Sequence, residues 1–108
     1  MRILHLCGNE EIMLVLITYD VSTEDGAGRK RLRRVAKECV NYGHRVQNSV
    51  FECILDSSQN LVLQDKLLSI IDKEKDSIRF YYLGNNYQNK VECFGANYGY
   101  EAEGTLIV

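Results

Sequence analysis

Two groups of residues have types and spacing that could do chemistry: a lone carboxylate and a dense run of cations. Asp20 directly follows the apolar run MLVLITY, so it stands where a buried strand would end. A carboxylate in this position can cap the loop or helix that follows, or it can bind a metal ion through its oxygens. The residue type by itself leaves both roles open.

The cationic group lies within one short segment. Six of the thirteen Lys and Arg residues fall between positions 29 and 37, and no acidic residue interrupts them. They are Arg29, Lys30, Arg31, Arg33, Arg34 and Lys37. The net charge of -2 conceals this asymmetry, because the acids lie elsewhere in the chain. Such a segment predicts a surface that binds a polyanion, with a merely solvated helix face as the alternative.

Composition argues against several other kinds of site. The four cysteines form no C-x-x-C pair, which disfavours a zinc knuckle or a redox motif. No apolar run reaches the roughly 18 residues of a membrane span, and the first residues lack the pattern of a secretion signal. His44 is expected in a loop and not as a general base. We therefore expect a cytoplasmic protein without membrane contact.

One domain of 108 residues has to position these groups. The run from Met13 to Tyr19 predicts a strand covered on both faces. Apolar residues at three- and four-residue steps predict a helix over residues 28–42, with cations on its opposite face and Gly43 as a left-handed cap. Residues 45–55 predict a strand region, which is either one kinked strand or two short ones.

The second half of the chain again alternates between predicted helix and strand. Asp56 or the two serines after it are expected to cap a helix that ends near Ile71. Residues 78–83 and 90–94 predict two more strands. The apolar tail TLIV has either to dock or to fray, and an edge strand on the partner's sheet is one place for it.

This order predicts an α+β fold, namely a ferredoxin-like βαββαβ domain with an additional C-terminal strand and with both helices on one face of an antiparallel sheet. The other face would be open to water, so we expect a homodimer that forms through the sheet.

Four motifs in this order resemble the CRISPR-associated Cas-two family, and the ending is most similar to members from type I-C systems. The motifs are YDVS at 19–22, RKRLRRVAK at 29–37, YGHRVQNSVFEC at 42–53 and DSIRFYYLG at 76–84. The resemblance covers residues 13–108 and leaves residues 1–12 as an N-terminal extension, with Met13 as an alternative start. It implies a CRISPR adaptation protein that binds duplex DNA and bridges the Cas-one integrase during spacer integration. It also implies a metal-dependent endonuclease acting on RNA or DNA.

The resemblance assigns roles to individual residues. Asp20 becomes the catalytic and metal-binding residue, with Mg²⁺ as the expected ion and Mn²⁺ as the alternative. The supporting residues of the site are Tyr19, Arg29, Arg31, Arg45, Ser49 and Phe51, and those expected to bind nucleic acid are Lys30, Arg33, Arg34 and Lys37. One carboxylate is a poor Mg²⁺ site, so Asp20 is expected to share the ion with its mate in the dimer. A purely architectural DNA-binding scaffold without physiological catalysis is the alternative function.

Overall fold

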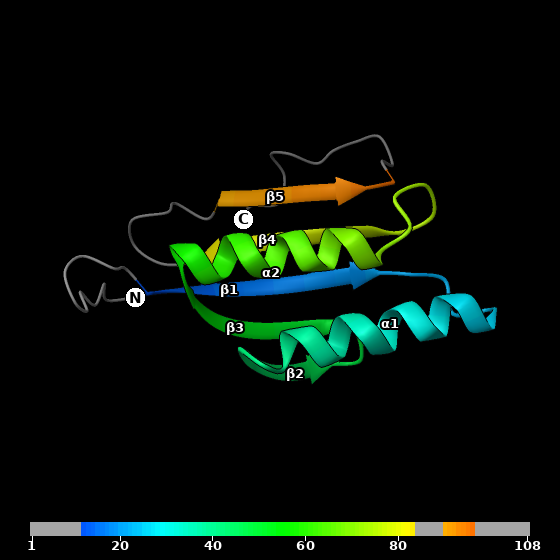
Figure 1. Cartoon of the computed structure of the whole chain (residues 1–108), viewed down its shortest axis with the longest axis horizontal. Coiled ribbons are helices and arrows are strands. Elements are labelled where there is room, and N and C mark those ends of the chain that lie inside the picture. The colour runs from blue at the N-terminus through cyan, green and yellow to red at the C-terminus, as the bar shows by residue number, and fades with distance from the viewer. Residues whose placement is uncertain (1–11, 84–89, 97–108) are drawn as a thin grey trace.

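The computed structural model describes residues 12–83 and 90–96 of the chain (Figure 1). Its elements, in chain order, are β1 (Ile12–Asp20), α1 (Gly26–Cys39), β2 (Gly43–Gln47), β3 (Val50–Asp56), α2 (Ser57–Ile70), β4 (Ser77–Leu83) and β5 (Lys90–Gly95). The strands form one antiparallel sheet in the order β2-β3-β1-β4-β5. The predicted α+β architecture, with a further strand after the βαββαβ unit, is therefore confirmed.

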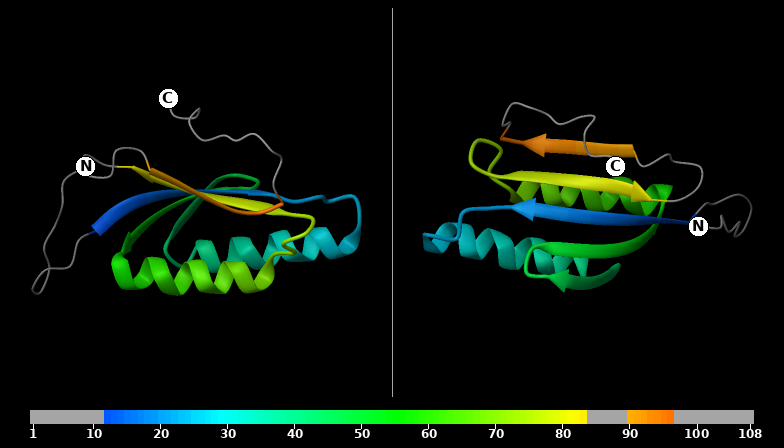
Figure 2. Two further views of the ribbon diagram at one scale, coloured as in Figure 1. Left: turned by 90° about the horizontal axis from the view of Figure 1, so that it is seen from above. Right: turned by 180° about the vertical axis from the view of Figure 1, so that it is seen from behind.

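Both helices cover the same face of the sheet, as the view from above in Figure 2 shows. The central strand β1 alternates strictly between this covered face and the opposite one. Val15 and Ile17 are fully buried beneath the helices, whereas Leu14 and Leu16 are only partly buried. The expectation of a strand covered on both faces was therefore wrong for the single chain, because both helices lie on one side.

The strand region after α1 is a hairpin of two strands, β2 and β3, with a shift of register between Arg45 and Gln47. Helix α1 ends earlier than expected, at Cys39, and Val40 caps it by donating its N–H to the Ala36 carbonyl at 3.0 Å. Gly43 is not a left-handed cap but the first residue of β2. A Cβ atom on Gly43 would lie 1.8 Å from the carbonyl oxygen of Glu52, so the glycine permits close contact between the two strands.

Helix α2 begins as its sequence predicts. The Asp56 carboxylate accepts a bond from the Gln59 N–H at 2.8 Å, and the Gln59 side chain accepts one from the Asp56 N–H at 2.9 Å. This reciprocal pair is a capping box, which satisfies donors that the helix leaves free. Within the described ranges, no helix is long and apolar enough to cross a membrane. The N-terminal extension before Ile12 and the TLIV tail lie outside the described residues.

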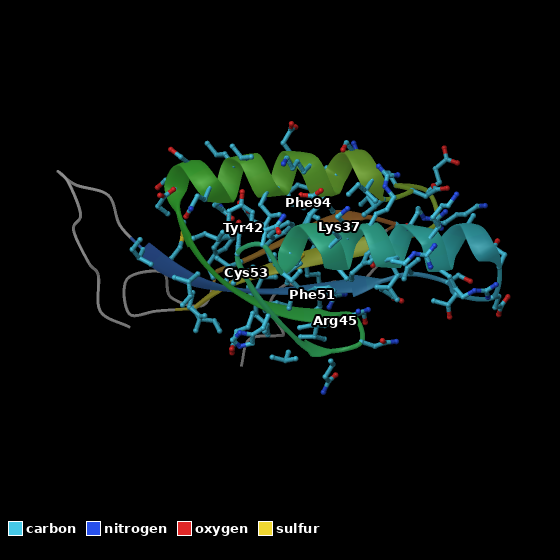
Figure 3. All side chains as sticks on the ribbon, turned by 60° about the horizontal axis from the view of Figure 1, so that its bottom comes forward. Lys37, Tyr42, Arg45, Phe51, Cys53 and Phe94 are labelled. Carbon is cyan, nitrogen blue, oxygen red and sulfur yellow. The ribbon has the colours of Figure 1, made fainter. Side chains whose placement is uncertain are left out.

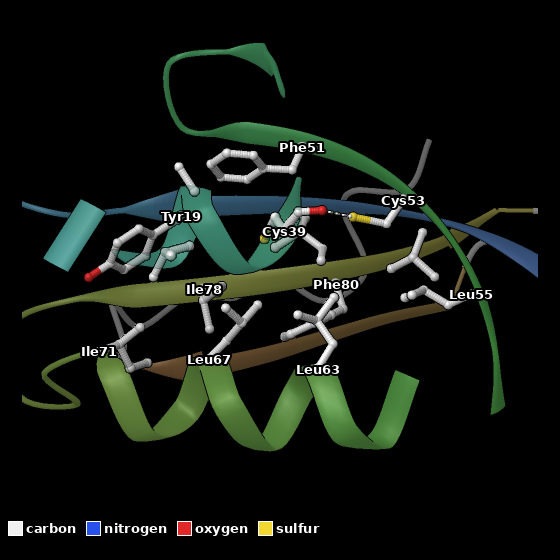
Figure 4. Close-up of a cluster of buried hydrophobic side chains, with 14 of the residues drawn as sticks. Tyr19, Cys39, Phe51, Cys53, Leu55, Leu63, Leu67, Ile71, Ile78 and Phe80 are labelled. Atoms are coloured by element: carbon white, nitrogen blue, oxygen red, sulfur yellow. Dashed lines mark hydrogen bonds between the residues drawn. The ribbon is translucent and has the colours of Figure 1, made fainter. Parts of the chain in front are cut away.

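The core fills the space between the helices and the sheet (Figure 4). Its largest fully buried side chains include Phe51 of β3, Phe80 of β4 and Leu63 and Leu67 of α2. Leu63, Leu67 and Ile70, at three- and four-residue steps, make up the buried face of α2.

Replacing Gly43 by alanine tests the close contact in the hairpin. We expect Gly43→Ala to lower the free energy of unfolding by about 2 kcal/mol, because the new methyl group overlaps backbone atoms of β3. The measurement is urea denaturation followed by circular dichroism.

Gly26→Ala is the matched control for this substitution. The nearest atom to a Cβ there is a guanidinium nitrogen of Arg29 at 3.9 Å, which is ordinary contact. We expect the control to be neutral or to stabilise by up to about 1 kcal/mol. Equal stabilities of the two variants would contradict the proposed role of Gly43.

Candidate functional site

The carboxylate of Asp20 is exposed at the end of β1, where the strand pairs with Ser77 of β4. It makes no hydrogen bond to any residue that the structure describes. Asp25 caps α1 instead, since its carboxylate accepts a bond from the Gly28 N–H at 2.9 Å, and this bond lowers the pKa of Asp25. The capping role that the residue type allowed for the helix therefore belongs to Asp25, and Asp20 stays open to solvent.

The loop that follows Asp20 packs directly on the first turn of α1. A Cβ atom on Gly28 would lie only 1.7 Å from the Ser22 carbonyl oxygen, so the glycine lets the two backbones touch. Arg29 ties the same loop from the side, because its Nη1 donates to the Thr23 carbonyl at 2.9 Å. The segment between Asp20 and the helix is thus held in place by α1.

A buried ionic network lies next to the end of β1. The Asp76 side chain is fully buried and accepts bonds from the Tyr19 hydroxyl at 2.5 Å and from Arg31 Nε at 2.8 Å and Nη2 at 3.1 Å. The Asp72 N–H adds a further bond at 3.0 Å. Asp76 therefore joins β1, α1 and the loop before β4.

The members of this network shift one another's pKa values. Burial on its own would raise the pKa of Asp76, but the bonds from Arg31, the Asp72 N–H and Tyr19 lower it below its usual value. Burial and the adjacent Asp76 carboxylate raise the pKa of Tyr19 well above its ordinary range, so the phenol remains a donor. Tyr19 and Arg31, two of the predicted supporting residues, are thus occupied in holding the end of β1.

Asp76 is absent from the site residues predicted from the sequence, where the acids were described only as lying away from the cationic segment. A signal was available, since Asp76 opens the DSIRFYYLG motif directly before an alternating strand. Its role depends on side chains 57 and 45 positions away, and spacing along the chain does not reveal such contacts.

The remaining supporting residues meet at the β2–β3 hairpin, which Figure 3 shows beneath α1. Phe51 is fully buried, and the Arg45 guanidinium carbon lies 5.6 Å from the centroid of its ring. Arg45 Nε also donates to the Asn48 carbonyl at 2.8 Å, while the Ser49 carbonyl accepts the Tyr19 N–H at 2.9 Å. Phe51 is a core residue, and the hairpin is bonded to the end of β1 next to Asp20.

The cations of α1 do not form one uniform face. Arg31 turns inward to Asp76, whereas Lys30, Arg34 and Lys37 are exposed. Arg29 and Arg33 are also exposed, and they line one hollow together with Arg45 of the hairpin. The structure thus brings together two predicted supporting residues and one predicted nucleic-acid-binding residue.

The expectation of a metal ion at Asp20 stays a prediction. Among residues 12–83 and 90–96, no group of three His, Cys, Asp or Glu side chains is placed to hold a metal ion. Mg²⁺ prefers near-octahedral oxygen coordination, so Asp20 would need ligands from water or from a second subunit.

Comparison with known proteins gives consistent matches. Residues 13–91 match the family described as CRISPR associated protein Cas2. The CRISPR-associated endoribonuclease Cas2 of Nitratidesulfovibrio vulgaris is 59% identical over 101 residues, which cover 94% of this chain and 98% of that relative. The CRISPR-associated endonuclease Cas2 of Halalkalibacterium halodurans is 62% identical over 95 residues, which cover 88% of this chain and 99% of that relative. The crystal structure of Streptococcus pyogenes Cas2 at pH 6.5 is 60% identical with a TM-score of 0.66, covering 70% of this chain and 92% of that one.

The Asp76 network can be tested through protein stability. Asp76→Asn leaves the Arg31 cation without its charged partner, so we expect the free energy of unfolding at neutral pH to fall by about 3 kcal/mol. The pKa of Asp76 is lower in the folded chain than its unfolded value of about 3.9. Its contribution is therefore present above that value and is lost as the pH falls through the folded pKa.

Chemical denaturation at neutral and acidic pH measures both effects. The variant should lose less stability on acidification than the parent chain. Asp65→Asn, at an exposed position of α2, is the matched control and should change stability by less than about 0.5 kcal/mol. The same acid dependence in Asp76→Asn and in the parent would contradict the assignment.

Proposed function

The chain belongs to the CRISPR-associated Cas2 (Cas-two) family, and from that premise we propose that it is a CRISPR adaptation protein with endonuclease activity on nucleic-acid phosphodiesters. The observation in this chain that carries the proposal is the exposed Asp20 carboxylate, held at a strand end next to a cationic helix. Relatives that span nearly the same length are named endoribonuclease and endonuclease, which supports the nuclease assignment. RNA and DNA both remain within the proposal.

We propose further that the active form is a homodimer through the open face of the sheet. This face carries partly buried or exposed apolar side chains from four strands, namely Leu14, Leu16, Ile54, Tyr81, Leu83 and Val91. The Ile54 side chain is 59% exposed although it lies within β3. Glu52 and Arg79 lie on the same face, opposite Leu16 and Thr18. Exposed apolar side chains of this kind are stabilised when a second copy covers them.

The alternation of β1 links this dimer to Asp20. Residues two apart on a strand share a face, so Asp20 follows Leu16 and Thr18 in the row that the helices do not cover. A two-fold axis through this face would bring the Asp20 of a second subunit close to the first. The two carboxylates could then hold one hydrated Mg²⁺, or Mn²⁺. The bound ion would polarise the scissile phosphodiester or activate a water molecule.

Nucleic-acid binding is proposed to use the exposed cations of α1. Lys30, Arg34 and Lys37 stay open to solvent and can contact phosphates, so affinity should fall steeply with salt. Backbone contacts of this type carry no base specificity, which suits a protein that must bind DNA of many sequences. We propose that the dimer holds duplex DNA in this way and bridges the Cas-one integrase during spacer integration, in a system of type I-C.

The alternative is an architectural dimer without physiological catalysis. It is favoured by the position of the α1 cations, whose exposure does not depend on Asp20. Duplex binding would then persist without any metal chemistry.

Substitution of Asp20 separates the two functions. Asp20→Asn removes the charge at nearly constant shape, so we expect metal-dependent cleavage to fall by about 100-fold or more while the fold stays intact. The assay titrates Mg²⁺ and Mn²⁺ over single- and double-stranded RNA and DNA, with Asp65→Asn as the control. Unchanged cleavage would remove Asp20 from the chemistry. Spacer acquisition by an inactive Asp20→Asn chain would favour the architectural role.

Ile54 offers a direct test of the dimer. Ile54→Arg places a charge on the proposed interface, and we expect monomers in sedimentation velocity because a buried unpaired cation is strongly unfavourable. Leu61→Arg on the outer side of α2 is the matched control, since Leu61 is 65% exposed and far from the open face. It should leave the dimer unchanged. A dimeric Ile54→Arg chain would contradict this interface.

A further inference from the structure

Two of the cysteines meet in the core between α1 and β3 (Figure 4). Cys39 is the last residue of α1, and Cys53 lies within β3. Both are free and fully buried, and the Cys53 thiol donates to the Cys39 carbonyl at 3.5 Å. They are 14 positions apart, and the sequence has no C-x-x-C spacing that would predict this contact.

The turn between α1 and β2 holds the two cysteines next to each other. The Cys39 carbonyl accepts the Tyr42 N–H at 3.0 Å, and the Tyr42 carbonyl accepts the Ile54 N–H at 3.1 Å. Gly43 is the register partner of Cys53, and a Cβ atom on this glycine would lie 2.7 Å from the Cys53 Cα atom. The turn is therefore bonded to β3 directly beside Cys53, so the end of α1 and this part of the strand have a fixed separation.

This separation is within the range that a covalent bond can span. Given the C=O and Cα–C bond lengths, the hydrogen bond places the Cys53 sulfur at most about 6 Å from the Cys39 Cα atom. The Cα atoms of two disulfide-bonded cysteines are about 4.4–6.8 Å apart. If Cys53 loses its S–H, the Cys39 carbonyl keeps the bond from the Tyr42 N–H, so a disulfide would leave no unsatisfied acceptor there.

We propose that Cys39 and Cys53 form a reversible disulfide when the chain meets a hydroperoxide, and that this bond is a redox-sensitive link between α1 and the sheet. The Cys53 thiolate attacks the peroxide, the O–O bond breaks, and Cys53 becomes a sulfenic acid. The Cys39 sulfur then attacks the Cys53 sulfur, so the S–S bond forms and the hydroxyl group leaves with the Cys39 proton as water. With hydrogen peroxide, two thiols and one peroxide give one disulfide and two water molecules, and the thiols lose two electrons to the peroxide.

The order of attack follows from the surroundings of the two thiols. The neighbouring Cys53 thiol and burial raise the pKa of Cys39, whereas the bond from the Cys39 thiol lowers the pKa of Cys53. Cys53 is therefore the first of the two to become a reactive thiolate. Val40, directly after Cys39, is 46% exposed, so local opening at the end of α1 would admit a small oxidant to the pair.

Peptide mapping of the parent chain tests the link directly. Trypsin cleaves after Lys and Arg, so Cys39 falls in the peptide of residues 38–45 and Cys53 in that of residues 46–66, while the other two cysteines fall in two further peptides. The folded chain is treated with hydrogen peroxide, alkylated with iodoacetamide in denaturant and digested. We expect most chains to yield the two peptides as one linked species that dithiothreitol separates. The oxidised chain should also unfold at a temperature about 5 °C higher, because the bond closes a loop of about 15 residues.

Two variants show whether the shift in unfolding temperature comes from this bond. Cys93→Ser is the matched control, since Cys93 is exposed on β5 and is the register partner of Arg79 on the uncovered face of the sheet. It should keep both the linked species and the shift. Cys53→Ser should lose both, and comparison of each variant with its own untreated sample removes any effect of the substitution on stability.

Three mapping results would overturn the proposal: both thiols remain open to alkylation, Cys53 accumulates as a sulfinic acid without the link, or either cysteine is joined to a different one. A shift that persists in Cys53→Ser would contradict it as well. The outcome is independent of the proposed nuclease function, because the samples contain neither nucleic acid nor added metal.

Discussion

The buried carboxylate of Asp76 connects three parts of the chain that are distant in sequence. It binds Tyr19 at the end of β1, Arg31 in α1 and the backbone of Asp72 before β4. A buried carboxylate is tolerated only when its oxygens are well bonded and its charge is matched, so these segments cannot shift independently. The positions of the neighbouring residue Asp20 and of the first half of α1 both follow from this constraint.

The second organising feature is the difference between the two faces of the sheet. Tyr19 and Asp20 are adjacent, yet they lie on opposite faces of β1 because side chains alternate along a strand. One anchors the strand in the core, and the other continues the row on the uncovered face. The proposed dimer and the proposed metal site thus depend on the same geometry, since covering that face would bring two copies of Asp20 together.

The cations of residues 29–37 have different surroundings although their residue types are similar. Successive positions point in different directions around the axis, so Arg31 turns toward the core while Lys30 stays in solvent. Arg29 and Arg33 are four residues apart and therefore share a side of the helix, which faces the β2–β3 hairpin and its Arg45. The segment combines a structural ion pair, a cationic surface and an arginine-lined hollow.

The sequence by itself determined the order of the elements, the start of α2 at its capping box and the family, because alternation, helical periodicity, caps and ordered motifs are local signals. It also identified Asp20 and the cations as candidates. Only the tertiary structure decided that Gly43 is needed for strand contact and that residues 45–55 belong to a hairpin. It alone revealed the partners of Asp76 and the meeting of Arg33 with Arg45. These features depend on contacts between segments far apart in the chain, and a local pattern carries no information about which distant side chain completes a hydrogen bond or lines a hollow.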